Sequence, residues 1–152
     1  MILVRNARLA DVPAMSAVLI ASITELCIAD HRNDPKVLAG WLANKTPDGV
    51  TKWFDSPDAT IVVAERNGEI AAVGGFNASR EITLNYVAPK HRFGGVSTAL
   101  LDAIERGLGP GEATLNSTET ARRFYKSRGW AESGAGENFA GTSAFPMQKF
   151  LG

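Results

Sequence analysis

A short glycine-bearing segment, Arg92-Phe93-Gly94-Gly95-Val96-Ser97, has the composition of an anion-binding loop. Residues 82–89 before it are rich in β-branched and aromatic types, and residues 98–105 after it are good helix formers. The segment therefore predicts a turn from a strand into a helix N-terminus, where backbone N–H groups lack acceptors and the helix dipole is positive. Glycines let a phosphate approach the backbone, and Arg92 adds positive charge.

Two common phosphate loops do not fit this segment. A dinucleotide fingerprint needs three spaced glycines, and a nucleoside-triphosphate loop needs Gly-Lys-Ser/Thr, which is absent. The pattern Arg-x-x-Gly-x-small, formed by Arg92, Gly95 and Ser97, instead resembles the pyrophosphate loop of the GNAT superfamily of acyl-CoA-dependent N-acyltransferases. Ser97 departs from the Gly or Ala that the family pattern has at the last position.

A second segment carries a tyrosine that could donate a proton. Residues 113–117 predict a short strand, and residues 118–129 predict a helix with Ser117 or Thr118 as its cap and Gly129 at its end. The segment resembles the family's Asn…Ala-x-x-Phe-Tyr-x-x-x-Gly-Phe motif, with Trp130 in place of the last Phe. Its matching residues are Asn116, Ala121, Phe124, Tyr125 and Gly129. With both motifs in the family's order, the chain is identified as a GNAT member.

The resemblance implies acetyl-CoA as cosubstrate and a role for each motif. The pyrophosphate would lie on the amides from Phe93 to Thr98, and the pantetheine would pair with the backbone of Tyr86 and Val87. The Val87 amide would polarise the thioester carbonyl. The expected cofactor-binding residues are Tyr86, Val87, Arg92, Phe93, Gly94, Gly95, Val96, Ser97, Thr98 and Asn116. For the glycines, an ordinary strand-to-helix turn is the alternative.

The resemblance makes Tyr125 the acid for the leaving thiolate, since a phenol is protonated at neutral pH. The alternative is a core aromatic residue. Asn116 would bind the pantetheine or a nearby backbone group, with a cap or turn role as its alternative.

No motif identifies the general base, so its candidates come from single carboxylates. Glu81 is the only carboxylate on the strand predicted at 81–87, where it would share a face with Thr83 and Asn85. A solvated position at the strand start is the alternative. Glu25 and Asp30 are the next candidates, and a neutral amine would need no single base.

The acceptor is expected to be a small-molecule amine. Four acidic residues in the first third of the chain hint at a cationic molecule such as a polyamine or an amino sugar: Glu25, Asp30, Asp34 and Asp48. A protein N-terminus or a lysine is the alternative acceptor.

Other reactive residue types have simpler interpretations. His31 and His91 lack metal-ligand spacing with each other or with Cys27, so no metal site is expected. Cys27 lies on the apolar face of a predicted helix and is interpreted as core. Trp41, Trp53 and Phe54 are expected to cover the sheet, with a lid over the acceptor as the alternative.

Composition limits the class of protein. The 152 residues suit one domain, 1–152, which is large enough to bury a core without disulfides. The net charge of +0 argues against nucleic acid as the main partner. A single cysteine fits a reducing compartment, and neither a leader nor a membrane span is expected, so we expect a cytoplasmic protein. The resemblance also makes a homodimer an expectation.

The order of predicted elements is β-α-α-β-β-β-α-β-α-β-β. Asp11 and Pro13 start the first helix, Asp34 and Pro35 the second, and residues 46–49 form a turn before a short helix at 50–54. The later strands are expected at 60–65, 70–76, 81–87, 113–116, 130–134 and 142–149, with Pro146 at an edge or bulge.

This element order matches the α/β (α+β) fold that the resemblance implies: a mixed, mostly antiparallel sheet, flanked by helices, that splays between its fourth and fifth strands. Acyl-CoA would lie in the splay.

The leading hypothesis is an acyltransferase that moves an acetyl group from acetyl-CoA to a primary amine by direct attack. A non-catalytic acyl-CoA-binding or sensing domain of the same fold is the first alternative. A different phosphate-binding protein, for a nucleotide, is the second.

Overall fold

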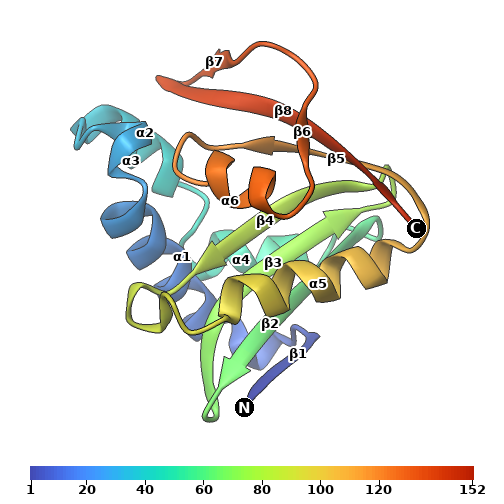
Figure 1. The fold of residues 1–152 in the computed structure, drawn as a ribbon. Coiled ribbons are helices and arrows are strands. Elements are labelled where there is room, and N and C mark those ends of the chain that lie inside the picture. Colours follow the sequence, from blue (N-terminus) through green and yellow to red (C-terminus); the bar gives the residue numbers. More distant parts are fainter.

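A twisted sheet organises the chain, and the computed structural model describes all 152 residues around it (Figure 1). The strands are β1 (Ile2–Asn6), β2 (Ala59–Arg66), β3 (Glu69–Asn77), β4 (Glu81–Val87), β5 (Gly111–Ser117), β6 (Ala131–Glu132), β7 (Glu137–Phe139) and β8 (Thr142–Leu151). The α-helices are α1 (Val12–Leu26), α2 (Ile28–His31), α3 (Pro35–Leu42), α4 (Pro47–Trp53), α5 (Val96–Leu108) and α6 (Arg122–Ser127). The chain also has two short 3-10 helices, η1 (Leu9–Asp11) and η2 (Pro89–His91).

The sheet is mixed and mostly antiparallel, as predicted. Its strand order is β1-β2-β3-β4-β5-β8-β6, and β7 pairs with β8. Every pair is antiparallel except β4 with β5.

The parallel pair opens into a splay. Only Glu81 with Thr114 and Ile82 with Leu115 are in register, so the edge of β4 that faces β5 has no strand partner over residues 83–87. The closed end is held by the Arg80 guanidinium, which donates to the carbonyls of Leu108 (2.6 Å), Gly109 (2.8 Å) and Glu112 (2.7 Å). One side chain therefore joins the start of β4 to the α5–β5 connection.

A β-bulge in β4 changes which residues share a face. Phe76 pairs with Ile82 while the adjacent Gly75 pairs with Leu84, so Thr83 is the extra residue. Ile82 packs in the cluster under α5, whereas Leu84 packs against the α1 cluster. The predicted simple alternation, with Glu81 and Asn85 on one face, is wrong because the bulge reverses the alternation between them.

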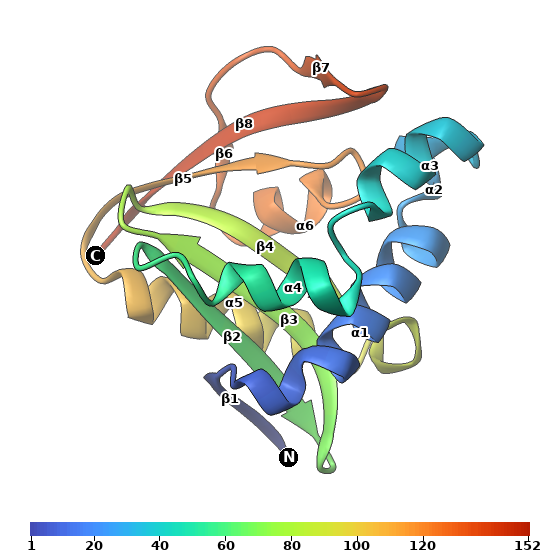
Figure 2. The same cartoon turned by 180° about the vertical axis from the view of Figure 1, so that it is seen from behind.

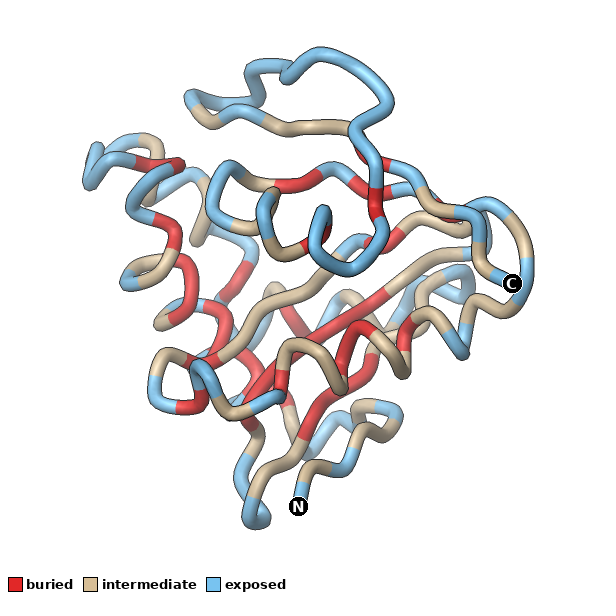
Figure 3. Tube along the Cα trace, viewed as in Figure 1, coloured by how far each residue is buried: buried red, intermediate tan, exposed pale blue.

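Helices cover both faces of the sheet. The cluster around Leu100, Leu101 and Ile104 of α5 lies on one face (Figure 1). The cluster around Met15 and Leu19 of α1 lies on the other, where α4 also packs (Figure 2). The buried residues accordingly follow α1, β3 and α5 through the middle of the molecule (Figure 3).

The first helix, with the turn before it, is by length and composition alone long and apolar enough to cross a membrane. Leu9–Leu26 covers 18 residues with a mean hydropathy of 1.5. Its side chains at Met15, Leu19 and Ile23 are fully buried in the fold, and this packing on the sheet accounts for the hydropathy.

Helix boundaries differ from the prediction at three places, one of which is α6: it spans only Arg122–Ser127, whereas a helix over 118–129 was predicted. Residues 46–49 are the first turn of α4 rather than a separate turn: Thr46 is the N-cap, and its Oγ1 accepts from the Gly49 amide at 3.1 Å. Pro47 follows at the first helical position, where its missing N–H costs nothing. The short α2 was not predicted, because four residues carry no periodic signal.

Strand β8 is interior rather than an edge. It pairs with β5 along residues 145–151 and, on its other side, with β7 and then β6. Pro146 lies in the interval between the β7 and β6 pairings, opposite Asn116, so its missing N–H interrupts no second ladder. The hairpin of β7 and β8 reaches toward α3 (Figure 2), where a Cβ at Gly141 would lie 2.6 Å from Val37.

Candidate active site

A cavity of about 470 Å³ occupies the splay. Its walls are the β4 segment Ile82–Val87, the β5 residues Leu115–Ser117, the start of α5, and the β5–α6 connection with Phe124 and Tyr125. Ser22, Leu26 and Cys27, at the end of α1, close it on the opposite face of the sheet. The cavity therefore runs from the α5 side of the sheet to the α1 side.

The α5 end of the cavity has the features of a phosphate site. Gly95 is the N-cap of α5 with φ +81°, and no side chain caps the first turn. Arg92, Phe93, Gly95, Ser97 and Thr98 line the cavity. Uncapped amides at the positive end of a helix bind anions, so the geometry fits the predicted pyrophosphate loop.

Two predicted loop residues lie outside the cavity lining. The Val96 side chain is buried in the core under α5, so only its backbone faces the loop. Gly94 lies against Arg66, because a Cβ at this glycine would be 2.0 Å from Arg66 Nη1. No ion pair or side-chain hydrogen bond engages the Arg66 guanidinium, which makes it a second cation beside the loop. Sequence reasoning missed it, since Arg66 lies on β2, far from the motif.

An aromatic residue in the loop is unusually placed. Phe93 is 92% exposed and has φ +62°, a conformation that costs a non-glycine residue about 1 kcal/mol. The Arg92 guanidinium lies over its ring at 4.8 Å. An exposed, strained side chain at a cavity mouth is typical of a functional site.

Tyr125 lies in the splay, held by a residue that the motifs did not include. Asn85 Nδ2 donates to the Tyr125 hydroxyl oxygen at 2.9 Å across the gap from β4 to α6. Burial raises the pKa of the Tyr125 phenol above its usual value, although the Asn85 hydrogen bond opposes the shift. The phenol is therefore protonated at neutral pH, with its oxygen accepting and its proton free to donate.

The remaining predicted cofactor residues also line the cavity. Val87 is at the end of the unpaired β4 edge, and Asn116 faces the cavity from β5. The Tyr86 side chain packs on the α1 side, where burial raises its pKa to about 12. The structure thus brings together Tyr86, Val87, Asn116 and Tyr125 in one cavity.

Glu81 does not reach this cavity. It lies at the closed end of the splay, where Asn77 Nδ2 donates to its Oε1 at 3.2 Å. Its assignment as the base therefore stays a prediction without geometric support, and the solvated position at the strand start fits better.

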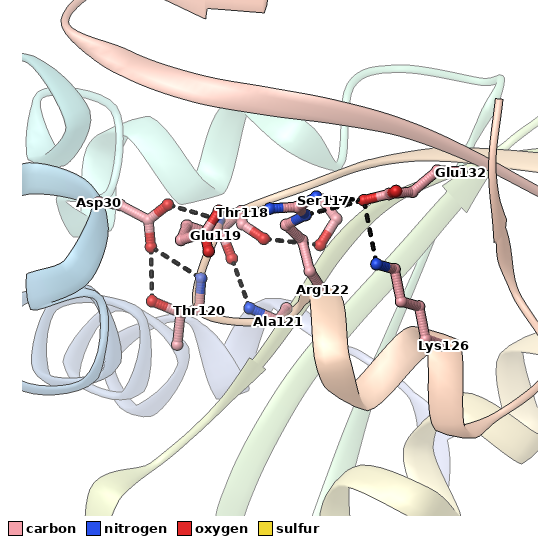
Figure 4. Close-up of polar contacts among 9 residues, drawn as sticks. All are labelled: Asp30, Ser117, Thr118, Glu119, Thr120, Ala121, Arg122, Lys126 and Glu132. Atoms are coloured by element: carbon pink, nitrogen blue, oxygen red, sulfur yellow. Dashed lines mark hydrogen bonds and ion pairs between the residues drawn. The ribbon is translucent and has the colours of Figure 1, made fainter. Parts of the chain in front are cut away.

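Asp30 has a structural contact that the sequence did not reveal (Figure 4). The residue is 6% exposed, and its carboxylate accepts from the Glu119 amide at 2.7 Å, the Thr120 amide at 3.2 Å and Thr120 Oγ1 at 2.5 Å. Next along the chain, Thr118 Oγ1 accepts from the Ala121 amide at 3.1 Å and closes the turn before α6. The N-cap of α6 itself is Ala121, so the prediction of Ser117 or Thr118 as the helix cap is wrong. Asp30 thus fastens α2 to a cavity wall.

The other acidic candidates are also outside the cavity lining. Asp34 caps α3, accepting from the Lys36 amide at 2.9 Å, while Glu25 and Asp48 are exposed. None of the four acids expected to bind a cationic acceptor lines the cavity.

The histidines and the cysteine are in structural surroundings. His31 is buried, with Nε2 at 2.8 Å from the Ile23 carbonyl and Nδ1 accepting from the Asn33 amide at 3.0 Å. His91 Nε2 lies 3.3 Å from Glu69 Oε2. Cys27 is 5% exposed, as predicted for a core residue, and burial raises its pKa to about 12. No group of three or more His, Cys, Asp or Glu side chains is arranged to hold a metal ion.

The aromatic residues on the α1 side divide into two groups. Trp53 and Phe54 pack against the α1 cluster and cover the sheet as predicted. Trp41 packs edge-on against His31, with 6.2 Å between ring centroids.

A family model described as an acetyltransferase (GNAT) domain matches residues 28–151. The chain belongs to this family. The match contains the loop, the splay and Tyr125, which are the parts described above.

Solved GNAT structures have the same fold. A GCN5-related N-acetyltransferase from Rhodopseudomonas palustris has a TM-score of 0.85 at 20% identity, over 98% of this chain and 95% of that one. The PaiA N-acetyltransferase from Thermoplasma acidophilum, solved with coenzyme A, has a TM-score of 0.79 at 16% identity, over 99% of each chain. The ribosomal-protein-S18-alanine N-acetyltransferase from Escherichia coli has a TM-score of 0.66 at 19% identity, over 99% and 94%. A search of curated protein sequences finds no match.

Proposed function

We propose that this GNAT domain is an N-acetyltransferase that moves an acetyl group from acetyl-CoA to a primary amine by direct attack. The observation that carries the proposal is the Tyr125 hydroxyl, held by Asn85 in a cavity that begins at an uncapped helix N-terminus. The PaiA structure with coenzyme A supports the cosubstrate by analogy of fold.

The residues present fit coenzyme A. The first-turn amides of α5, with Arg92 and Arg66, would hold phosphate oxygens. The unpaired edge of β4 offers backbone donors and acceptors to an amide-bearing chain, in the manner of an added strand. Bound there, acetyl-CoA supplies a thioester carbonyl carbon that an amine can attack.

The chain's own groups would then manage charge and protons. The Val87 amide, at the open end of β4, is the donor for the thioester oxygen. Tyr125 donates a hydrogen bond to the sulfur as the C–S bond breaks and the C–N bond forms. Because burial raises the pKa of Tyr125, net loss of its proton is unfavourable, so it acts as a relay. The nitrogen loses one proton, and the sulfur gains one.

The first test is ligand binding. Acetyl-CoA or coenzyme A at about 100 times its Kd should stabilise the protein by about 2.7 kcal/mol, which is a rise in Tm of roughly 5–10 °C, while ATP and NAD should not. No shift with either CoA species would contradict the proposal.

The second test is Tyr125→Phe. It should lower kcat by about 10²-fold or more while leaving the Kd for coenzyme A within about twofold. Unchanged kcat would assign the proton donor to another residue, whereas binding of coenzyme A with no turnover of any amine by the unaltered protein would favour the non-catalytic acyl-CoA-binding domain. A homodimer and a cytoplasmic location stay predictions. Sedimentation equilibrium would measure the oligomeric state.

A further inference from the structure

The chemistry at the α1 end of the cavity bears on the acceptor. The phosphate-binding end is at α5, so the pantetheine would enter from that side and the acceptor from the other. At the acceptor end the walls are Ser22, Leu26 and Cys27 from the end of α1, with Leu84 and Tyr86 from β4. These side chains are apolar or uncharged.

No carboxylate lines any part of the cavity. Its single ionic side chain is Arg92, which is at the cofactor end. The two acidic hydrogens at the acceptor end are retained at neutral pH, because burial holds the pKa values of Cys27 and Tyr86 near 12. The acceptor end therefore has no carboxylate on its surface, and the nearest anion is Asp30 behind the wall, whose charge adds to the raised pKa values of Cys27 and Tyr86.

The carboxylates nearest this end are engaged elsewhere. Asp30 accepts three hydrogen bonds from the β5–α6 connection (Figure 4). Glu119 pairs with Arg122 at 2.8 Å, and Glu25 is exposed and off the lining. No carboxylate on the lining is in place to contact a cation or to accept its proton.

We infer that the acceptor is a weakly basic primary amine on an uncharged, apolar body, rather than a polyamine or a lysine side chain. The inference rests on the proposed function and names the substrate class of the same site. A cation that enters this end is desolvated with no carboxylate in contact, because the Asp30 oxygens already accept from Glu119 and Thr120, so the amine must arrive neutral.

The size of the effect follows from the acceptor's own pKa. At pH 7.5 about one third of an α-amine with pKa near 7.8 is neutral, against about 1 in 800 for a lysine-type amine near 10.4. The site would therefore favour the weaker base by roughly 250-fold from protonation alone. An enzyme-borne base would remove much of that difference.

The experiment measures kcat/KM against pH from 6.5 to 10 with matched acceptors and acetyl-CoA. One is a leucyl tripeptide amide with a free α-amine, and the second is an N-acetylated tripeptide amide with one lysine. Leucine amide separates a small molecule from a peptide as the source of the weakly basic amine, and spermidine is the polycation. Coenzyme A release is followed by chromatography.

The expected result is that the α-amine profile levels off near pH 8 while the lysine profile still rises above pH 9.5. Equal midpoints for both acceptors, or preference for spermidine at pH 7.5, would overturn the inference. Binding of coenzyme A without acetylation of either α-amine would also overturn it, whereas no binding of coenzyme A refutes the proposed function itself.

A variant pair tests the charge argument directly. Leu26→Glu places a carboxylate on the lining and should raise the lysine-to-α-amine rate ratio by about tenfold. Glu25→Gln, at the adjacent exposed position, should leave that ratio within twofold. A change in ratio with Glu25→Gln instead would show that an exposed carboxylate serves the acceptor, and would contradict the inference.

Discussion

The contact of Asp30 with the β5–α6 connection makes a prediction about stability. Asp30→Asn keeps the shape of the side chain and one oxygen acceptor, but it places an NH2 group opposite donors. With that oxygen kept for the Glu119 amide, the two hydrogen bonds from Thr120 are lost. A hydrogen bond to a charged group contributes about 1.5–3 kcal/mol, so the loss should be at least about 3 kcal/mol.

Urea unfolding gives the magnitude. For a domain of this size, about 3 kcal/mol corresponds to a fall in Tm of about 6–12 °C. Thr120→Val removes only the hydroxyl donor and should cost about 1.5 kcal/mol. Asp34→Asn is the matched control: Asp34 is exposed and caps α3, and asparagine is an equally good N-cap, so the change should stay below about 0.5 kcal/mol.

Two further readouts localise the effect. Amide exchange at Thr120 should accelerate by more than about tenfold in Asp30→Asn, because this N–H group loses its acceptor, whereas exchange at Glu119, which keeps its acceptor, should change less. In a double-mutant cycle, Asp30→Asn and Thr120→Val should be non-additive, since they remove the same hydrogen bond. If Asp30→Asn is as stable as Asp34→Asn, or if the two changes add, the contact does not fasten the connection and the reasoning fails.

Three other residues give separate predictions. Arg66→Gln should weaken coenzyme A binding by about 3–10-fold, more at low salt, whereas Lys52→Gln on α4 should not; equal effects would exclude a local contact. The hydrogen bond from Arg5 lowers the pKa of Asp11 from 3.8 to about 2. Ionised Asp11 therefore stabilises the fold above about pH 4, and this stabilisation is lost as the pH falls toward 2. Asp11→Asn should remove about 1–2 kcal/mol of that acid-dependent stability in urea unfolding, and an unchanged pH profile would contradict it. With a pKa near 12, Cys27 is about 1 part in 10,000 thiolate at pH 8, so iodoacetamide should label it far faster in urea than in the fold; equal rates would contradict burial.

Local chemistry made much of the fold predictable. The hairpin turn after β2 and the cap at Asp34 are short-range signals, and the structure has both of them. The phosphate loop and Tyr125 were found for the same reason, since each lies within a continuous motif. The splay itself entered through the family resemblance, because no local pattern tells parallel strands where to separate.

The features that were missed depend on long-range contacts. Asn85 meets Tyr125 across 40 positions, and Asp30 meets Thr120 across 90, so neither pairing has a sequence signature. The bulge at Thr83 moved Glu81 to the face opposite Asn85, and a period of two cannot reveal an inserted residue. Arg66 reaches Gly94 only because β2 ends beside the loop.

The carboxylates around the cavity have structural partners, and this bears on catalysis. Asp30 holds the wall before α6, Glu119 pairs with Arg122, and Glu81 lies with Asn77 at the closed end. These acidic residues hold parts of the site together, and none of them lines the cavity. Proton loss from the amine would therefore fall to solvent before binding, and selection among acceptors would follow amine basicity as well as shape. Leu26→Glu, which adds a carboxylate to the lining, tests whether the charge of the cavity wall decides which amine is preferred.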